Sequence, residues 1–377
     1  MIVPMRRDLP IPVTIAALLG VGLALAFFAH LLFASVPRDG FRQPSVEMQP
    51  RAAGTRVVAA ISPYIDVHCH LDPANAVGAI QATLEAMHAA NTAKLIFMPS
   101  PFTPDDRNRF DDEVILAGER GHRDKLVFLG GGGTLNVMIQ RSVRSGDVGS
   151  DAQRQFKQRA EEIIRQGAAG FGEIAGEHFA TSPSAYYEYA PPDHPLLLVL
   201  ADVSAQHGGA PIDFHMEAVP QSMPLPADLR SPPNPPQLHP NIAAFERLLE
   251  HNPHAQIVWA HAGWDNTGYR TADLCGKLLR AHPNLYMEIK VDPVDVGKNS
   301  ILMNGGRGAI KPEWLTLFRE FPDRFVMGTD QHYPEPVKGP QRWQAAVLLF
   351  NQLPADLRRK IGLENPTRIY HLRSSAR

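Results

Sequence analysis

Two histidines separated by a single residue end an apolar stretch near the start of the globular part of the chain. The stretch runs from Tyr64 to Asp72, and the histidines are His68 and His70. In a β-strand alternate side chains share one face, so both imidazoles would point the same way and Cys69 the other way. Neutral imidazole nitrogens bind divalent ions such as zinc, iron, nickel or manganese. The pair predicts a metal site, although an ordinary strand end with two partly exposed histidines has the same local sequence.

Short apolar runs alternate with longer helical segments along the rest of the chain. Besides the first strand at 64–72, strands are expected over 94–98, 125–129, 168–173, 211–215, 256–261, 285–290 and 324–330. Helices are expected over 75–91, 110–122, 151–166, 196–207, 241–251, 271–282 and 312–321, and helices are expected to fill the chain after the last strand. Eight strand–helix repeats in alternation predict an α/β fold, a (β/α)8 TIM barrel.

Six side chains with metal-binding atoms stand at the carboxyl ends of these strands. They are His68 and His70 on the first strand, Glu173 on the fourth, His215 on the fifth, His261 on the sixth and Asp330 on the eighth. Barrel strands converge at their carboxyl ends, where the active sites of this architecture lie. Each residue alone has a structural explanation, such as a core histidine, a salt-bridging glutamate or a helix-capping aspartate. Together they predict a site for one or two divalent metal ions, with zinc as the expected ion.

The order of these motifs resembles the amidohydrolase superfamily, and within it the amidohydrolase-2 branch. The matching motifs are D-x-H-x-H at 66–70, G-x-G-E at 170–173, A-H-x-G at 260–263 and G-T-D at 328–330. The segments IVWAHAGW, NLYMEIK, RFVMGTDQHYP and ENPTRIYHL add to the resemblance, which covers about residues 62–372. It implies a metal-dependent hydrolase on a TIM barrel. The same branch also holds enzymes similar to amino-carboxymuconate-semialdehyde decarboxylase.

The resemblance also implies a role for each of the six residues. His68, His70 and Asp330 would hold one metal. In members with one metal His215 completes the site and His261 acts on the substrate, whereas in members with two metals both histidines hold the second ion. A carboxylate from the fourth strand then bridges the ions. Glu173 stands in GFGEIAGEH, which resembles the strand of the TatD-type metal-dependent hydrolases that carries a bridging glutamate. The number of metals stays open, and Glu173 favours two.

This set of ligands indicates hydrolysis. A bound divalent ion lowers the pKa of its water from about 16 to about 7 and polarises a carbonyl or phosphoryl oxygen. Asp330 would take the proton of that water and pass it to the leaving group, and His261, if it is not a ligand, would stabilise the developing oxyanion. We expect an enzyme that cleaves a C–O or C–N bond of a small-molecule lactone, ester or amide. The alternatives are a non-oxidative decarboxylase with one metal, and a metal-binding scaffold barrel, which the complete set of ligands disfavours.

Charge and composition limit the partners of the protein. The 377 residues include 37 basic and 39 acidic side chains, for a net charge of −2. This balance gives no electrostatic reason to expect nucleic acid as a partner and disfavours a nuclease of the TatD type. The two cysteines, Cys69 and Cys275, do not make a disulfide framework. Four basic residues either recognise a substrate carboxylate or carry solvated charges: Lys290, Arg307, Lys311 and Arg342.

Other polar residues near the ligand strands are given structural roles. Asp66 is expected on the inward face with His68, one layer deeper, and Cys69 is expected to be a packed thiol facing the helices. Three further residues are expected to lie exposed in loops after the ligand strands: Glu177, His178 and His332. The glycine run at 130–133 has no phosphate-binding pattern and is expected to form a tight strand exit.

Residues 11–33 are almost wholly apolar and long enough for a membrane span of about 20 residues. A retained signal anchor and a cleaved signal peptide both fit this stretch. Ala34 and Ser35 make a poor cleavage site, which favours the anchor. We expect residues 1–36 to be this anchor or signal peptide, 37–60 to be a linker and 61–377 to be the catalytic barrel. The barrel is expected to be tethered to or exported across a membrane, on its periplasmic or extracytoplasmic side.

Overall fold

The computed structural model describes residues 59–107, 109–110, 121–182, 185–293, 300–305, 308–334 and 341–372. The chain divides into two units, Met1–Thr55 and Arg56–Arg377, and every described residue lies in the second. The predicted membrane segment therefore lies outside the described residues, as does most of the helix expected at 110–122. Within the described ranges, no helix is both long and apolar enough to cross a membrane.

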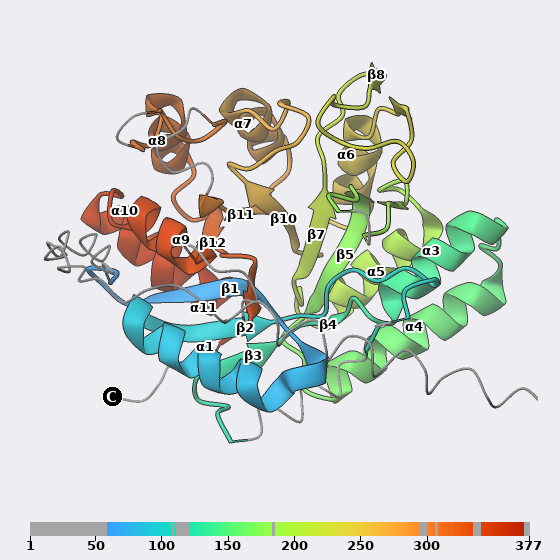
Figure 1. Ribbon diagram of the computed structural model, residues 1–377. Helices are drawn as coiled ribbons and strands as arrows, with labels where there is room; N and C mark the ends of the chain where they lie inside the picture. Colours follow the sequence, from blue (N-terminus) through green and yellow to red (C-terminus); the bar gives the residue numbers. More distant parts are fainter. Residues whose placement is uncertain are drawn as a thin grey trace, which may run out of the picture. The chain divides into compact units, whose positions relative to one another are not determined.

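Parallel β-strands form the centre of the described unit (Figure 1). They are β1 Tyr64–Leu71, β2 Thr92–Phe97, β3 Leu126–Phe128, β4 Gly130–Gly131, β5 Phe171–His178, β7 Ile212–Met216, β10 Ile257–Ala262, β11 Leu285–Ile289 and β12 Phe325–Met327. Their hydrogen-bonded order is β3-β2-β1-β12-β11-β10-β7-β5-β4. Only Leu129 separates β3 from β4, so the two ends of this order belong to one stretch of chain. This mostly parallel α/β fold is consistent with the predicted TIM barrel.

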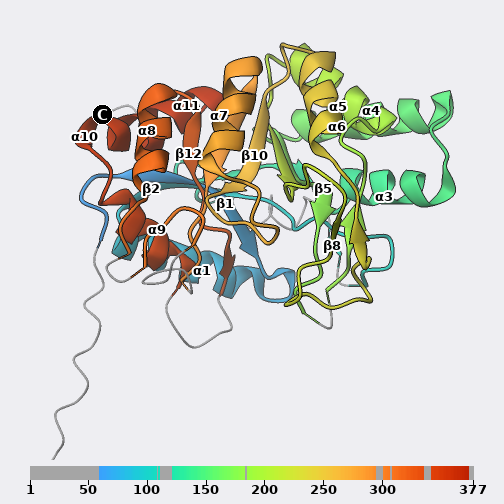
Figure 2. The same cartoon turned by 90° about the horizontal axis from the view of Figure 1, so that it is seen from above.

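Helices surround these strands when the unit is viewed from above (Figure 2). They are α1 Ala76–Ala90, α3 Leu135–Ser145, α4 Ser150–Arg165, α5 Pro195–Gln206, α6 Ile242–His251, α7 Ala272–Ala281, α8 Pro312–Glu320, α9 Arg342–Phe350, α10 Ala355–Arg359 and α11 Asn365–Ile369. Local sequence sets several of their ends. The hydroxyl of Thr271 accepts a hydrogen bond from the backbone N–H of Leu274 and caps α7, and proline begins α5 and α8. The sequence analysis did not predict α3.

Short strands add to the edges of this framework. β6 Glu188–Tyr189 pairs antiparallel with β5, and β13 Gln331–Tyr333 pairs with β1. β8 Met223–Pro224 and β9 Gln237–Leu238 form a separate two-stranded sheet within residues 216–240, a segment that is rich in proline. The glycine run was expected to form a tight strand exit. Its first two residues form β4, and Gly132 lies so close to the backbone of Pro99 and Ser100 that a Cβ would overlap their carbonyl oxygens.

The first strand changes its inward face partway along its length. Ile65 and Val67 pack with Val258 and Val326 from β10 and β12, and side chains from such separate strands meet inside the ring of strands. The pairing with β2 shifts from Asp66 onward, because the three steps of β1 from Asp66 to Cys69, which include Val67, oppose two steps of β2. Such a bulge reverses the alternation of side chains.

Asp66 is therefore not placed as the strict alternation predicted. Its carboxylate accepts hydrogen bonds from the Cys69 thiol at 3.2 Å and from the Thr329 hydroxyl at 2.7 Å. Burial raises the pKa of Asp66 to about 6, although these hydrogen bonds favour the ionised form. The prediction that Asp66 shares the inward face with His68, one layer deeper, is wrong, because its carboxylate contacts Cys69 and Thr329. Cys69 is fully buried, which agrees with the packed thiol that was predicted.

Candidate metal centre

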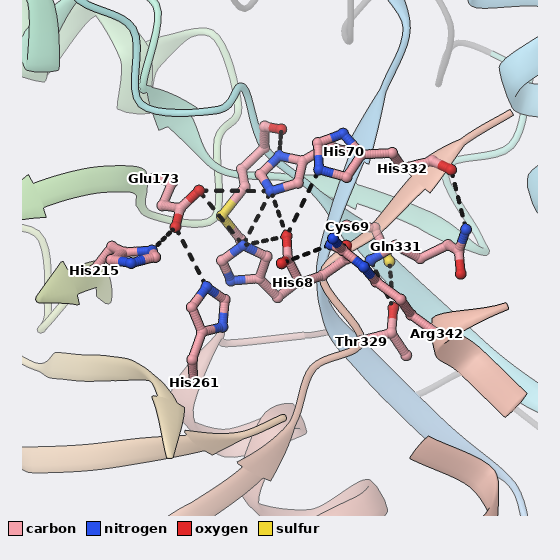
Figure 3. Close-up of polar contacts among 12 residues, drawn as sticks. His68, Cys69, His70, Glu173, His215, His261, Thr329, Gln331, His332 and Arg342 are labelled. Atoms are coloured by element: carbon pink, nitrogen blue, oxygen red, sulfur yellow. Dashed lines mark hydrogen bonds and ion pairs between the residues drawn. The ribbon is translucent and has the colours of Figure 1, made fainter. Parts of the chain in front are cut away.

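The six residues singled out by sequence lie together, and Figure 3 shows His68, His70, Glu173, His215 and His261 turned toward one another. Glu173 was expected to end its strand, but it is the third residue of β5, which continues to His178. β1, β5, β7 and β10 supply His68, His70, Glu173, His215 and His261, and Asp330 lies between β12 and β13. The five residues on the strands are buried, whereas the side chain of Asp330 retains 13% exposure. Polar groups buried to this degree need partners of opposite charge or a bound ion.

Glu173 lies between two pairs of imidazoles. Its Oε2 atom is 3.7 Å from Nε2 of His68 and 3.5 Å from Nε2 of His70. Its Oε1 atom is 2.6 Å from Nδ1 of His215 and 3.5 Å from Nε2 of His261. Each oxygen of one carboxylate thus faces a separate pair of nitrogen donors. The arrangement makes two adjoining groups of ligand type that share Glu173, each with its ligand atoms within 4.8 Å of one another.

Asp330 turns its two oxygens in different directions. Oδ1 is 3.1 Å from Nε2 of His70, on the side of the histidines, whereas Oδ2 receives the ammonium of Lys290 at 2.5 Å and the guanidinium of Arg342 at 2.7 Å. Burial by itself raises the pKa of Asp330, but the charges of Arg342 and Lys290 hold that pKa well below its usual range. The carboxylate is therefore ionised at neutral pH and offers Oδ1 to the centre.

Backbone strain marks two of the six residues. His261 has a φ of 68° and Asp330 a φ of 52°, both in the left-handed region that costs a non-glycine residue about 1 kcal/mol or more. Strained backbone of this kind persists where the surroundings hold it and gathers at functional sites. The fold therefore holds His261 and Asp330 in conformations that their own backbone disfavours, which agrees with a site that needs their side chains in fixed places.

Two acids below the histidines were not predicted from the sequence. Glu288 of β11 is fully buried, with Oε2 2.9 Å from Nδ1 of His68 and Oε1 3.5 Å from Nδ1 of His261. Asp213 of β7 is also fully buried, with Oδ2 3.4 Å from Nδ1 of His68. The signal that could have found them is a carboxylate in the middle of an otherwise apolar strand, in PIDFH and in LYMEIK. In a strand buried on both sides such a residue needs a partner.

The carboxylates around His68 favour a positive charge at this position. Burial lowers the pKa of His68, but the carboxylates of Asp213, Glu288 and Glu173 more than offset this effect and raise that pKa well above its usual value. A site that draws a proton onto a fully buried imidazole also attracts a metal ion. The donor set of imidazole nitrogens and carboxylate oxygens suits zinc and related divalent ions. The residues present therefore fit a divalent metal.

Other residues near the centre differ in part from the sequence-based predictions. Glu177 was expected in an exposed loop, but it belongs to β5, is buried, and accepts hydrogen bonds from Tyr187 at 3.1 Å and Asn241 at 2.9 Å. His178 is partly exposed, with its ring centroid 4.6 Å from that of His215. His332 has a half-exposed side chain, with 47% exposure, but it was expected in a loop and belongs to β13, where its Nε2 lies 3.8 Å from Oδ1 of Asp330.

The four basic residues proposed for carboxylate recognition separate into three groups. Lys290 and Arg342 lie at the centre, on Asp330. Lys290 is buried, and its ammonium also lies 4.2 Å from the centroid of the Trp264 ring. Lys311 precedes the first turn of α8 and is partly exposed. Arg307 lies outside the described residues. Lys290 is therefore a buried ion-pair partner, not a solvated charge.

The chain is similar to several solved structures. It covers 99% of a probable 2-pyrone-4,6-dicarboxylic acid hydrolase from Acinetobacter baumannii, with 82% of its own length, 11% identity and a TM-score of 0.49. It covers 100% of an amidohydrolase 2 from Bifidobacterium longum subsp. infantis, with 83% of its own length, 13% identity and a TM-score of 0.41. It covers 86% of a dihydroorotase from Saccharomyces cerevisiae, with 84% of its own length, 10% identity and a TM-score of 0.45.

No curated protein matches the chain in sequence. A family model does match, and its description is amidohydrolase. The match runs over residues 65–372. This range contains all six residues of the centre and all of the strands except Tyr64, the first residue of β1. The chain belongs to the amidohydrolase-2 branch of the amidohydrolase family. It is an enzyme of the amidohydrolase superfamily of metal-dependent hydrolases.

Proposed function

We propose that the enzyme hydrolyses a C–O or C–N bond of a small lactone, ester or amide at a centre of two divalent metal ions. The observation that carries this proposal is the position of Glu173, whose two oxygens each face a separate pair of imidazoles. One ion would be held by His68, His70 and Asp330, and the other by His215 and His261. Glu173 would bridge them. Zinc is the proposed ion because it accepts both imidazole and carboxylate ligands.

The residues of the chain would divide the work as follows. Divalent ions in such a centre lower the pKa of water to about 7 and polarise the oxygen of the scissile carbonyl. Oδ1 of Asp330 faces the histidines and is placed to take a proton from that water and deliver it to the leaving group. Lys290 and Arg342 fix the orientation of this carboxylate through Oδ2. Their charges also favour the ionised form of Asp330, the form that can accept a proton.

The number of bound metals tests the proposal. Metal content per chain is measured by plasma mass spectrometry on the wild-type protein, on a Glu173→Ala variant and on a Glu85→Ala variant as the surface control. Two metals that fall to one or none only in Glu173→Ala would support the bridged centre and direct activity assays to lactones, esters and amides. One metal in all three proteins would refute the bridging role of Glu173. A folded wild-type protein that binds no metal would overturn the proposal altogether.

A non-oxidative decarboxylase with one metal is the second candidate. It needs a basic residue beside the metal to receive a substrate carboxylate, and Lys290 and Arg342 lie beside the proposed ligand Asp330. The product separates the two reactions, since decarboxylation releases carbon dioxide and hydrolysis does not. Carbon dioxide evolved from a carboxylated substrate, by a protein that holds a single metal, would favour this candidate.

We also propose that residues 1–36 tether the enzyme to a membrane or direct its export. The support is the apolar stretch at 11–33 with its poor cleavage site. The test is expression of the whole chain in a Gram-negative bacterium, followed by separation of membranes and protease treatment of spheroplasts. Protein in the membrane fraction that is degraded from outside would support an extracytoplasmic barrel. A protease-protected protein with its N-terminus intact would contradict it.

A further inference from the structure

Both oxygens of Glu288 face imidazoles from below the candidate centre. Oε2 lies 2.9 Å from Nδ1 of His68, and Oε1 lies 3.5 Å from Nδ1 of His261. The same two histidines turn Nε2 toward opposite oxygens of Glu173, at 3.7 Å and 3.5 Å. The four side chains therefore form a closed ring in which two carboxylates alternate with two imidazoles. His68 belongs to one of the two proposed metal positions and His261 to the other.

The ring determines which nitrogen of each histidine is available to a metal. A neutral imidazole carries its proton on one nitrogen only, and the nitrogen that binds a metal must be the other one. When Nε2 of His68 or His261 faces the centre as a ligand, the proton remains on Nδ1. Glu288 is the carboxylate that both Nδ1 atoms share, and it is fully buried, so water does not replace it. Carboxylate partners of this kind orient ligand histidines and increase their basicity.

The neighbouring backbone is shaped around Glu288. A Cβ atom on Gly328 would overlap the Oε1 and Cδ atoms of Glu288. Gly328 has no positive φ, so the glycine is not required by the backbone conformation. The absence of a side chain at position 328 therefore leaves room for the carboxylate under the two histidines.

Asp213 provides a built-in comparison. It is as deeply buried as Glu288 and lies 3.4 Å from Nδ1 of His68, and among the described residues His68 is the only histidine that its carboxylate contacts. Substitutions of Asp213 and Glu288 can therefore distinguish an effect on His68 alone from an effect on both His68 and His261.

We propose that Glu288 is a positioning residue that fixes His68 and His261 together as Nε2 ligands, and so links the affinities of the two metal positions. The proposal rests on the proposed two-metal centre. Glu288 is not a catalytic residue in this account, because it contacts the histidines from the side away from Glu173. Removing its charge is expected to weaken both positions, whereas removing the charge of Asp213 is expected to weaken only the position that contains His68.

The test uses the full chain loaded with zinc, and compares wild type with Glu288→Gln and Asp213→Asn. Stepwise zinc affinities are measured by competition with a chelator, and the Nδ1–H signals of histidines are recorded by ¹⁵N–¹H NMR. Loss of a carboxylate behind a ligand histidine typically lowers metal affinity by about 10–100-fold. We expect that loss for both zinc ions and two altered Nδ1–H signals in Glu288→Gln, but one ion and one signal in Asp213→Asn.

Gly328→Ala supplies a second, independent variant in case Glu288→Gln does not fold. It keeps the carboxylate in the chain but displaces it, so it is expected to reproduce the effect on both zinc ions. A Glu288→Gln or Gly328→Ala protein that is folded, by its unfolding midpoint, and loses affinity for one zinc ion only would overturn the proposal. The proposal would also be overturned if the wild-type chain bound a third zinc ion that both Glu288→Gln and Asp213→Asn lost. Such a result would place a metal ion between Glu288 and Asp213.

These outcomes are distinct from failure of the proposed function. A wild-type chain that binds a single zinc ion would refute the two-metal centre, yet the Nδ1–H signals of His68 and His261 would still report on Glu288. Two altered signals in Glu288→Gln would then support the shared contact, and one or none would refute it.

Discussion

The ammonium of Lys290 lies 2.5 Å from Oδ2 of Asp330, at a place where neither side chain has more than 13% exposure. Arg342 approaches the same oxygen at 2.7 Å, and Trp264 covers the ammonium. Breaking a buried ion pair from one side leaves an uncompensated charge, which typically costs about 3–5 kcal/mol. Arg342 remains as a second partner of Asp330 when Lys290 is removed. The loss of stability is therefore expected near the lower end of this range.

Replacing Lys290 with Met should therefore lower the free energy of unfolding by about 3 kcal/mol in the presence of a chelator. The loss should be smaller with zinc bound, because the metal compensates the charge of Asp330. Denaturant unfolding with and without zinc measures both values. Lys157→Met is the matched control, since the pair of Lys157 with Glu161 at 3.8 Å is exposed and is expected to contribute less than about 1 kcal/mol. An equal loss with and without zinc would contradict the link between Lys290 and the metal centre.

The strands and the residues that end them could be predicted because their signals are local. Each strand is a short apolar run, and His68, His215 and His261 stand where such a run stops. The family resemblance then ordered the same residues into a site. Family membership is confirmed, and the six residues do lie together.

The acids under the histidines could not be predicted with the same rules, because their partners come from other strands. Asp213 and Glu288 are separated from His68 by more than a hundred residues of sequence. Asp66 was misplaced for a different reason, since strict alternation does not foresee a bulge. For Lys290 the sequence left open substrate recognition and a solvated charge, because nothing local indicates that Asp330 and Trp264 lie against its ammonium.

The carboxyl group of Glu177 should make the protein less stable as the pH rises. Burial raises its pKa to about 8, an effect that the hydrogen bond from Tyr187 reduces and the nearby Glu217 increases. The folded state therefore binds a proton that the unfolded state has released above its ordinary pKa of 4.5. This stability is fully present below about pH 4.5 and is lost as the pH rises toward 8, at up to about 1.4 kcal/mol per pH unit.

Glu177→Gln tests this dependence, because its neutral amide cannot ionise. Unfolding free energies of wild type and variant are measured between pH 5 and pH 9. The difference between the two proteins should shift in favour of the variant as the pH rises. A difference that stays constant over this range would show that Glu177 is already ionised in the folded protein.

Gly132 should not tolerate a side chain. A Cβ at this position would overlap the carbonyl oxygen of Pro99 and lie 2.7 Å from that of Ser100, and backbone atoms cannot swing away. Gly132→Ala is therefore expected to lower the free energy of unfolding by about 1–3 kcal/mol. Gly121→Ala is the control, because its Cβ would meet no atom within 4 Å. Equal stability of the two variants, measured by denaturant unfolding, would contradict the close approach seen here.

Arg270 should be needed for stability rather than for charge at the surface. It is almost fully buried, its guanidinium lies 4.6 Å from the Trp259 ring centroid, and it donates hydrogen bonds to the carbonyl oxygens of Ala260 and Met216. A lysine cannot make both of these contacts in the same plane. Arg270→Lys is expected to cost about 2 kcal/mol or more, since it leaves a buried carbonyl without its donor. Arg280→Lys, at an exposed pair with Glu320, should change the stability much less than Arg270→Lys.

The shift in pairing along β1 divides one strand into two parts with separate duties. Ile65 and Val67, before or within the shift, fill the apolar interior, whereas His68 and His70 face the polar centre. The interior can accept other apolar residues of similar volume without any change at the histidines. The strand can therefore vary in its first half to suit folding, and its second half can remain fixed for chemistry. The one extra residue in β1 relative to β2 therefore separates the packing of the interior from the placement of the histidines.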